Sequence, residues 1–175
     1  MKIRMTPQPH HTIPATLPPA NCFTVLVIDD LLPNRVLLRK VLKSAGYAVA
    51  EAADGSEALA MLNSGSVTPD LVVTDIEMPV LDGIAFVESL RLLDGPLARI
   101  PVIAASGNAD EAMREEALHA GADLFLAKPF DLSGLRRRIG ALIKESRSAG
   151  ERETAPLPPA ESAPNRVALR LREAG

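Results

Sequence analysis

Five polar side chains that could bind a metal ion or a phosphoryl group stand just after short apolar segments. They are Asp29, Asp30, Asp75, Ser106 and Lys128. Clustered carboxylates repel one another unless a proton or a hard cation neutralises them, and Mg²⁺ takes carboxylate and phosphate oxygens as ligands. A carboxylate beside Mg²⁺ can attack phosphorus and form an aspartyl phosphate, while an ammonium and a hydroxyl group can hold phosphoryl oxygens. The residue types therefore predict a magnesium-dependent phosphoryl-transfer site, if the fold brings the five together.

The elements that must position these side chains alternate along the chain. Five short apolar segments lie at residues 24–28, 47–52, 70–74, 100–105 and 123–127, and four of them are nearly continuous runs rich in Val, Ile and Leu, the pattern of strands buried on both faces. Stretches with helical spacing follow them: a run from Pro33 that stops at Gly46, then residues 55–62, 83–93, 109–120 and 132–143. This alternation predicts an α/β fold, a doubly wound (βα)5 with one parallel sheet and helices on both faces.

Such a sheet would bring the polar residues to one edge. Open parallel sheets bind ligands outside the carboxyl ends of their strands, where the strand order reverses. In the five-stranded order 2-1-3-4-5, the strands that precede the five polar residues are contiguous. We therefore expect three carboxylates, a hydroxyl and an ammonium group in one crevice.

The composition argues against several other classes of protein. The net charge of −3, the 3% aromatic content and the lack of Trp argue against a nucleic-acid binder. No apolar run approaches the roughly 18 to 20 residues that span a bilayer, so we expect no membrane protein. Cys22 is the single cysteine and can form neither an intramolecular disulfide nor a zinc site, which fits a reducing cytoplasm.

Proline divides the 175 residues into three parts. Nine of the 15 prolines lie in the first 20 and the last 28 residues, and neither stretch has a sustained hydrophobic period. We therefore predict a disordered tail over 1–21, one domain over 22–147 and a disordered tail over 148–175. The last stretch is too short for an effector domain, so the expectation is a domain that acts alone.

Four motifs resemble one known family. VLVIDD (25–30), DLVVTDIEMPVLDG (70–83), PVIAASG (101–107) and GADLFLAKPF (121–130) look like the motifs of the receiver domain of bacterial two-component response regulators. Their order and spacing match over essentially all of 23–142. The resemblance implies a flavodoxin-like fold, and a chemotaxis-regulator-like, single-domain signalling protein rather than an enzyme.

The resemblance also implies roles for the acidic residues. Asp75 would accept a phosphoryl group from a sensor histidine kinase or a histidine phosphotransfer protein. Asp30 and Asp75 would ligate Mg²⁺, Asp29 would hold a metal-bound water, and the backbone carbonyl of Glu77 would complete the protein ligands.

A second set of residues would contact the phosphoryl group or change position when Asp75 is phosphorylated. By the same resemblance, Lys128 would contact the phosphoryl group, and its peptide bond to Pro129 would be cis. Ser106 would move toward the phosphate, and the ring of Phe125 would turn inward into the space that Ser106 leaves.

The output would then be a change of protein-binding surface. We expect the partner to be a downstream protein target or a relay member, with no direct nucleic-acid or membrane contact. The face formed by helix 109–120, strand 123–127 and helix 132–143 has acids on its first helix and Arg136–Arg138 on its last. Opposite charges on one face can pair across a two-fold axis, so this face could also form a homodimer.

Two other functions remain as alternatives. Phosphatases of the haloacid dehalogenase type also use an aspartate nucleophile with Mg²⁺, but they need a second acid two residues later, usually Asp. Glu77 stands there, and no long cap insertion exists. A flavodoxin-like cofactor binder needs a phosphate-binding loop after the first strand, whereas the acidic loop 29–33 would repel the phosphate of FMN.

Overall fold

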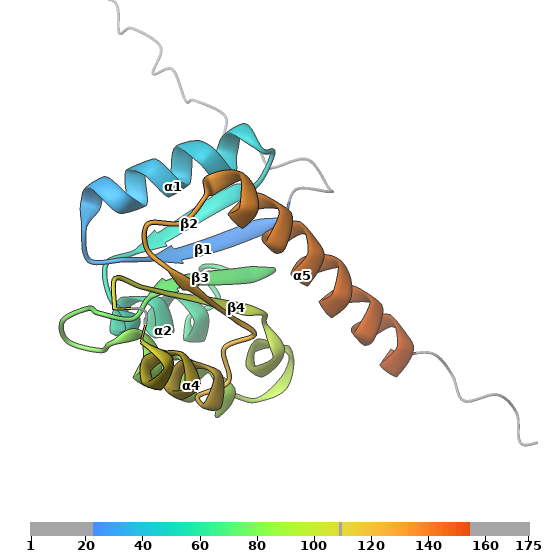
Figure 1. The fold of residues 1–175 in the computed structure, drawn as a ribbon. Helices are drawn as coiled ribbons and strands as arrows, with labels where there is room; N and C mark the ends of the chain where they lie inside the picture. Colours follow the sequence, from blue (N-terminus) through green and yellow to red (C-terminus); the bar gives the residue numbers. More distant parts are fainter. Residues whose placement is uncertain (1–22, 109, 155–175) are drawn as a thin grey trace, which may run out of the picture.

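Five parallel strands form one sheet in the order β2-β1-β3-β4-β5. The computed structural model describes residues 23–108 and 110–154 (Figure 1). The strands are β1 (Thr24–Ile28), β2 (Ala48–Ala52), β3 (Leu71–Asp75), β4 (Val102–Ser106) and β5 (Leu124–Ala127). The helices are α1 (Leu32–Ser44), α2 (Gly55–Asn63), α3 (Gly83–Arg91), the 3₁₀ turn η1 (Gly95–Arg99), α4 (Glu111–His119) and α5 (Leu132–Thr154). The predicted α/β architecture and strand order are confirmed.

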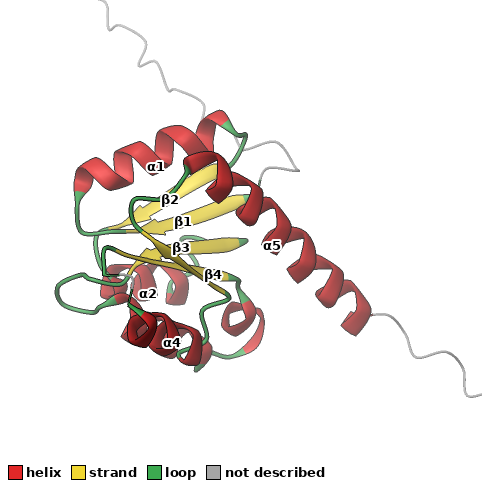
Figure 2. Cartoon of the chain, in the orientation of Figure 1, coloured by secondary structure: helices red, strands yellow, loops and turns green. Residues whose placement is uncertain are grey.

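Helices cover both faces of the sheet because its strands are apolar on both sides (Figure 2). Along β1, Val25 and Val27 pack in a cluster with side chains of α1 and α5. Leu26 and Ile28 pack in a second cluster, with side chains of α2, α3 and α4. These four side chains of β1 are all buried. The continuous apolar runs of the sequence thus become the central layer of the domain.

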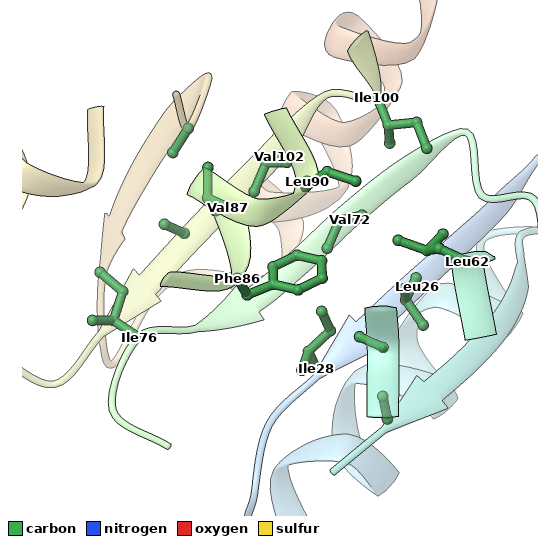
Figure 3. Close-up of a cluster of buried hydrophobic side chains, with 14 of the residues drawn as sticks. Leu26, Ile28, Leu62, Val72, Ile76, Phe86, Val87, Leu90, Ile100 and Val102 are labelled. Carbon is green, nitrogen blue, oxygen red and sulfur yellow. The ribbon is translucent and has the colours of Figure 1, made fainter. Parts of the chain in front are cut away.

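Phe86 is the largest side chain of the second cluster, and its ring lies among side chains of β1, β3 and α3 (Figure 3). It is fully buried, so truncation to alanine removes apolar contacts and leaves a cavity. We expect Phe86→Ala to lower the free energy of unfolding by about 3–5 kcal/mol. Urea titration of both proteins measures this difference, and a loss below about 1 kcal/mol would contradict the packing described here.

Aspartates begin three of the helices. The side chains of Asp54, Asp82 and Asp110 accept hydrogen bonds from the backbone amides at the starts of α2, α3 and α4, at 2.9, 2.8 and 2.7 Å. These carboxylates satisfy amides that have no partner within the helix. They also fix the loops that leave the carboxyl edge of the sheet.

Gly83, the first residue of α3, allows that helix to approach the end of β3 closely. A Cβ atom at this position would lie 2.1 Å from the carbonyl oxygen of Asp75. Only glycine fits such a contact, so the β3–α3 loop closes directly over the carboxyl end of β3.

The last helix differs from the prediction. α5 continues to Thr154, whereas the sequence predicts a helix that ends at 143 and a disordered tail that begins at 148. No proline interrupts the chain between 132 and 155, and Pro156 is the first residue that disfavours a helical conformation before it. The prediction that residues 148–154 are disordered is therefore wrong, while the predicted tail residues 1–21 and 155–175 lie outside the described residues.

The structure also adds the turn η1, which the sequence analysis did not predict. Arg91 at the end of α3 holds it, because its guanidinium donates to the carbonyl oxygens of Ala98 and Ile100 at 3.0 and 2.8 Å. Among the described residues, no helix combines the length and the hydrophobicity that a membrane crossing requires.

Candidate functional site

The carboxyl edge of the sheet brings three acidic side chains together. Asp29 and Asp30 follow β1, and Asp75 ends β3, the strand beside it. One carboxylate oxygen of each lies within 4.8 Å of the others. Asp29 and Asp75 are buried, and Asp30 is the most exposed of the three. The convergence expected from the strand order is therefore present for these residues.

Lys128, just after β5, reaches into this acidic cluster from the other side. Its Nζ atom lies 2.7 Å from Asp75 Oδ2 and 3.0 Å from Asp29 Oδ2. The peptide bond between Lys128 and Pro129 is cis, as expected. Four of the five predicted side chains thus form one cluster.

Asp29 is held rigidly by its neighbours. It is 2% exposed. Its Oδ1 atom accepts a hydrogen bond from the backbone amide of Leu31 at 2.9 Å, and Asn34 Nδ2 lies 3.0–3.1 Å from both oxygens. Asn34 was not among the predicted site residues, although an amide on the first turn of a helix that follows an acidic pair was a usable signal.

Asp75 is buried with one oxygen that has no partner. Its Oδ2 atom pairs with Lys128, but Oδ1 accepts no hydrogen bond among the described residues. Burial raises the pKa of Asp75 above its usual value, and the charge of Asp29 adds to this, while Lys128 and the backbone of Glu77 oppose it. A buried acceptor without a donor is unusual in a folded protein. Its lone pairs are available to a cation or to phosphorus.

Lys128 stays charged in this environment. Burial alone would lower the pKa of its ammonium group, but the hydrogen bonds to Asp75 and Asp29 outweigh burial and raise the pKa above the usual value. The cluster therefore contains three carboxylates and one fixed positive charge. A divalent cation would balance it, and the oxygen-only donor set and the open Oδ1 atom of Asp75 fit Mg²⁺.

Ser106 lies at the same edge, but its hydroxyl is turned into its own loop. Asp75 pairs with Ala105 across the sheet, so Ser106 is the next residue on the neighbouring strand. Its fully buried Oγ atom donates to the carbonyl oxygen of Asn108 at 2.8 Å and accepts from the amide of Asn108 at 2.9 Å. Among the described residues, the hydroxyl of Ser106 forms no hydrogen bond to Asp75 or Lys128, although the backbone carbonyl of Ser106 accepts one from the Lys128 amide at 2.7 Å.

Glu77 and Phe125 border the cluster on different sides. The side chain of Glu77 is exposed and reaches Ser106 at the end of β4 and Gly107 in the loop after it. Phe125 lies on β5, is half-buried and packs against the core cluster that includes α3 and α4. The contact between Glu77 and Gly107 was not predicted from the sequence.

Known proteins share this arrangement of sequence and fold. The family model of the response regulator receiver domain matches residues 25–140. The transcriptional regulatory protein PrrA of Mycobacterium leprae is 41% identical over 120 residues, which cover 69% of this chain and 49% of PrrA. The chain therefore spans about half the length of this curated relative.

Solved receiver domains superpose on the same part of the chain. The receiver domain of the Francisella response regulator 1452 gives a TM-score of 0.64 at 32% identity, over 70% of this chain and 98% of that one. The receiver domain of the sensor histidine kinase PA1611 from Pseudomonas aeruginosa PAO1 was solved with a magnesium ion in its active site cleft. It gives a TM-score of 0.62 at 32% identity, with the same coverage.

The matched residues include β2 to β5 in full, β1 except its first residue, and every residue of the acidic cluster. The family match covers more than half of the chain, and the sheet has the order expected of such a domain. This chain belongs to the response regulator receiver domain family.

Proposed function

We propose that this chain receives a phosphoryl group on Asp75 from a histidine kinase or a histidine phosphotransfer protein, within a cytoplasmic two-component phosphorelay. The observation that carries the proposal is the state of the Asp75 carboxylate. It is buried, one oxygen is fixed by Lys128 at 2.7 Å, and the other accepts no hydrogen bond among the described residues. A carboxylate that is held in place but still has an open oxygen is suited to attack phosphorus.

The transfer itself is a displacement at phosphorus. An oxygen of Asp75 forms the new bond to phosphorus, and the bond from phosphorus to the donor's imidazole nitrogen breaks with its electron pair staying on the ring. Bound Mg²⁺ would supply charge neutralisation between the carboxylates and the phosphoryl oxygens. Asp30 and Asp75 would hold it directly, with Asp29 holding a water and the carbonyl of Glu77 completing the set.

Lys128 and Asp29 position the acceptor for this reaction. Lys128 holds Asp75 Oδ2 and is placed to pair with a phosphoryl oxygen once the Asp75 carboxylate has become an acyl phosphate. Asp29 fixes Lys128 in turn, and Asn34 fixes Asp29. The chain is thereby pre-organised, so little rearrangement is needed at the moment of transfer.

Ser106 and Phe125 would convert the phosphorylation into a new surface. Ser106 would give up its bond to Asn108 and turn to the phosphoryl group, and Phe125 would move inward from its half-buried position. The affected face contains exposed Glu111, Glu115 and Glu116 on α4 and exposed Arg136–Arg138 on α5. Complementary charges on one face support binding to a protein partner or to a second copy of the chain.

The partner that delivers the phosphoryl group would bind beside the acidic cluster. Leu31 and Leu32, directly after Asp30, are 55% and 58% exposed. Exposed leucines next to a charged site are a feature of protein-binding surfaces. We propose that they contact the phosphodonor protein.

The proposal is tested by offering the chain three reagents in parallel. With acetyl phosphate and Mg²⁺ we expect one acid-labile, hydroxylamine-sensitive phosphoryl group per chain. With FMN we expect no binding, and with a general phosphatase substrate no turnover. Multiple turnover of the phosphatase substrate would favour the haloacid dehalogenase alternative, and tight FMN binding the flavodoxin-like one.

Magnesium should also stabilise the fold, because it binds the folded state and neutralises crowded carboxylates. At a Mg²⁺ concentration about tenfold above its Kd, we expect the free energy of unfolding to increase by about 1.4 kcal/mol. This increase raises Tm by a few degrees. The control is NaCl at the same ionic strength, and Asp30→Ala should lose the increase. An unchanged Tm in millimolar Mg²⁺ would contradict a metal site at the cluster.

A further inference from the structure

The side chain of Glu77 connects two loops at the carboxyl edge of the sheet. Glu77 lies two residues after Asp75, in the β3–α3 loop. Its Oε2 atom accepts a hydrogen bond from the backbone amide of Gly107 at 3.3 Å and lies 3.4 Å from Ser106 Oγ. Ser106 is the last residue of β4, and Gly107 is the first residue of the loop that follows it. A negatively charged oxygen thus already faces a hydroxyl and an amide at this edge.

The Ser106 hydroxyl and the Gly107 amide lie beside Asp75, where they could bind a phosphoryl group on that residue. Asp75 pairs with Ala105 in the sheet register, so Ser106 and Gly107 are the next two residues along the neighbouring strand. A phosphoryl group on Asp75 would bring anionic oxygens to this edge, and such oxygens are stabilised by fixed hydroxyl and amide donors. The carboxylate of Glu77 is also an anion and contacts the same two groups, although the single hydroxyl proton of Ser106 points mainly to the Asn108 carbonyl at 2.8 Å and only secondarily to Glu77 at 3.4 Å.

We propose that the Glu77 side chain competes internally with the phosphoryl group for the donors of Ser106 and Gly107. This inference rests on the proposed function of Asp75. In the unphosphorylated chain Glu77 holds the β4–α4 loop in its resting position. Phosphorylation displaces the carboxylate, and the loop then turns toward Asp75. Glu77 is a positioning residue in this scheme, because it acts through Ser106 and Gly107.

The surroundings of Glu77 make it suitable for this role. Its side chain is exposed, so its carboxylate can move into water when it is displaced. Ser106 retains its two bonds to Asn108 when Glu77 is removed, so the loop has a second support. Substitution of Glu77 therefore leaves no buried polar group without a partner and should leave the fold intact.

A simpler explanation is that Glu77 acts only through its charge, which would repel any anion at Asp75. Two substitutions separate charge from contact. Glu77→Asp keeps the charge but is one methylene too short to reach Gly107. Glu77→Gln keeps the reach and an acceptor oxygen but loses the charge. Competition for the donors depends on reach, whereas simple repulsion depends on charge.

The experiment compares wild type, Glu77→Asp, Glu77→Gln and Glu77→Ala, with Glu88→Asp as a control. Glu88 is an exposed acid on α3. The first readout is the chemical shift of the Gly107 amide proton in metal-free protein. The second is the affinity for beryllofluoride, a phosphoryl analogue, at fixed Mg²⁺. We expect Glu77→Asp and Glu77→Ala to shift the Gly107 resonance upfield and to bind beryllofluoride about threefold to tenfold more tightly.

The remaining outcomes are equally definite. Glu88→Asp should match wild type in both readouts, and Glu77→Gln should keep the Gly107 resonance near its wild-type position. A Glu77→Asp variant with the wild-type Gly107 resonance and wild-type affinity would overturn the proposal. The proposal would also fail if Glu77→Gln and Glu77→Ala bound beryllofluoride equally more tightly than wild type while Glu77→Asp did not. If wild type itself binds no beryllofluoride, the proposed function of Asp75 fails, while the Gly107 resonance still tests the contact.

Discussion

Replacing Asp75 with asparagine should abolish phosphorylation by acetyl phosphate or by a phosphorylated histidine kinase. The amide is a poor nucleophile and cannot form an acyl phosphate in place of the carboxylate. Asparagine has nearly the same size as aspartate, so the packing at the end of β3 should persist. Intact-protein mass spectrometry measures the phosphorylated fraction.

Asp94→Asn is a matched control for this prediction. Asp94 is exposed at the start of η1, and its side chain makes no capping hydrogen bond there. We expect this variant to be phosphorylated like wild type. Uptake of one hydroxylamine-sensitive phosphoryl group by Asp75→Asn would show that another residue is the acceptor.

Replacing Lys128 with methionine should slow phosphorylation by about 10²–10³-fold, the effect typical of losing one group that stabilises transition-state charge. Methionine has a similar length but no charge, so Asp75 and Asp29 would lose their shared cation at 2.7 and 3.0 Å. The pKa of Asp75, already raised by burial, would then rise further because Lys128 no longer opposes it. A smaller ionised fraction of Asp75 slows the attack on phosphorus.

The rate of labelling by acetyl phosphate at saturating Mg²⁺ checks this prediction. Lys144→Met changes an exposed lysine of α5 in the same way and should leave the rate unaltered. A Lys128→Met variant that reacts at the wild-type rate would contradict the role given to the Lys128 ammonium group.

Much of the fold could be predicted because the strands are unusually clear in the sequence. β1 has the predicted bounds, since a run of buried aliphatic residues ends sharply at the polar Asp29. The predicted end of α5 was wrong because no comparable change in the sequence marks where this helix ends. Composition indicated a tail, but residues 144–154 contain no proline, and a single glycine does not stop a helix. Local composition therefore located the strands better than the helix ends.

For the site, position was predictable and side-chain direction was not. The topology brings Asp29, Asp30, Asp75 and Lys128 together because their strands are neighbours, and strand order follows from the β-α alternation. The hydroxyl of Ser106 instead follows the turn of its own loop toward Asn108. Such directions depend on loop dihedral angles, which hydrophobic patterns do not encode.

Contacts between loops were the other part that the sequence did not reveal. The hydrogen bond between Asn34 and Asp29 joins residues that are five apart in the sequence. The hydrogen bond between Glu77 and Gly107 joins residues that are thirty apart, in two different loops. Neither loop has a motif that specifies the other. Only the sheet register, with Asp75 opposite Ala105, brings them into contact.

The central claim is that Asp75 itself receives the phosphoryl group, and mapping the modified residue tests it most directly. The wild-type chain is treated with acetyl phosphate and Mg²⁺, the acyl phosphate is reduced with borohydride, and the peptides are sequenced by mass spectrometry. Reduction converts a phosphorylated aspartate into homoserine. The account predicts homoserine at position 75 and unmodified aspartate at positions 29 and 30. Homoserine at 29 or 30, or at no position in a chain that has taken up phosphate, would contradict it.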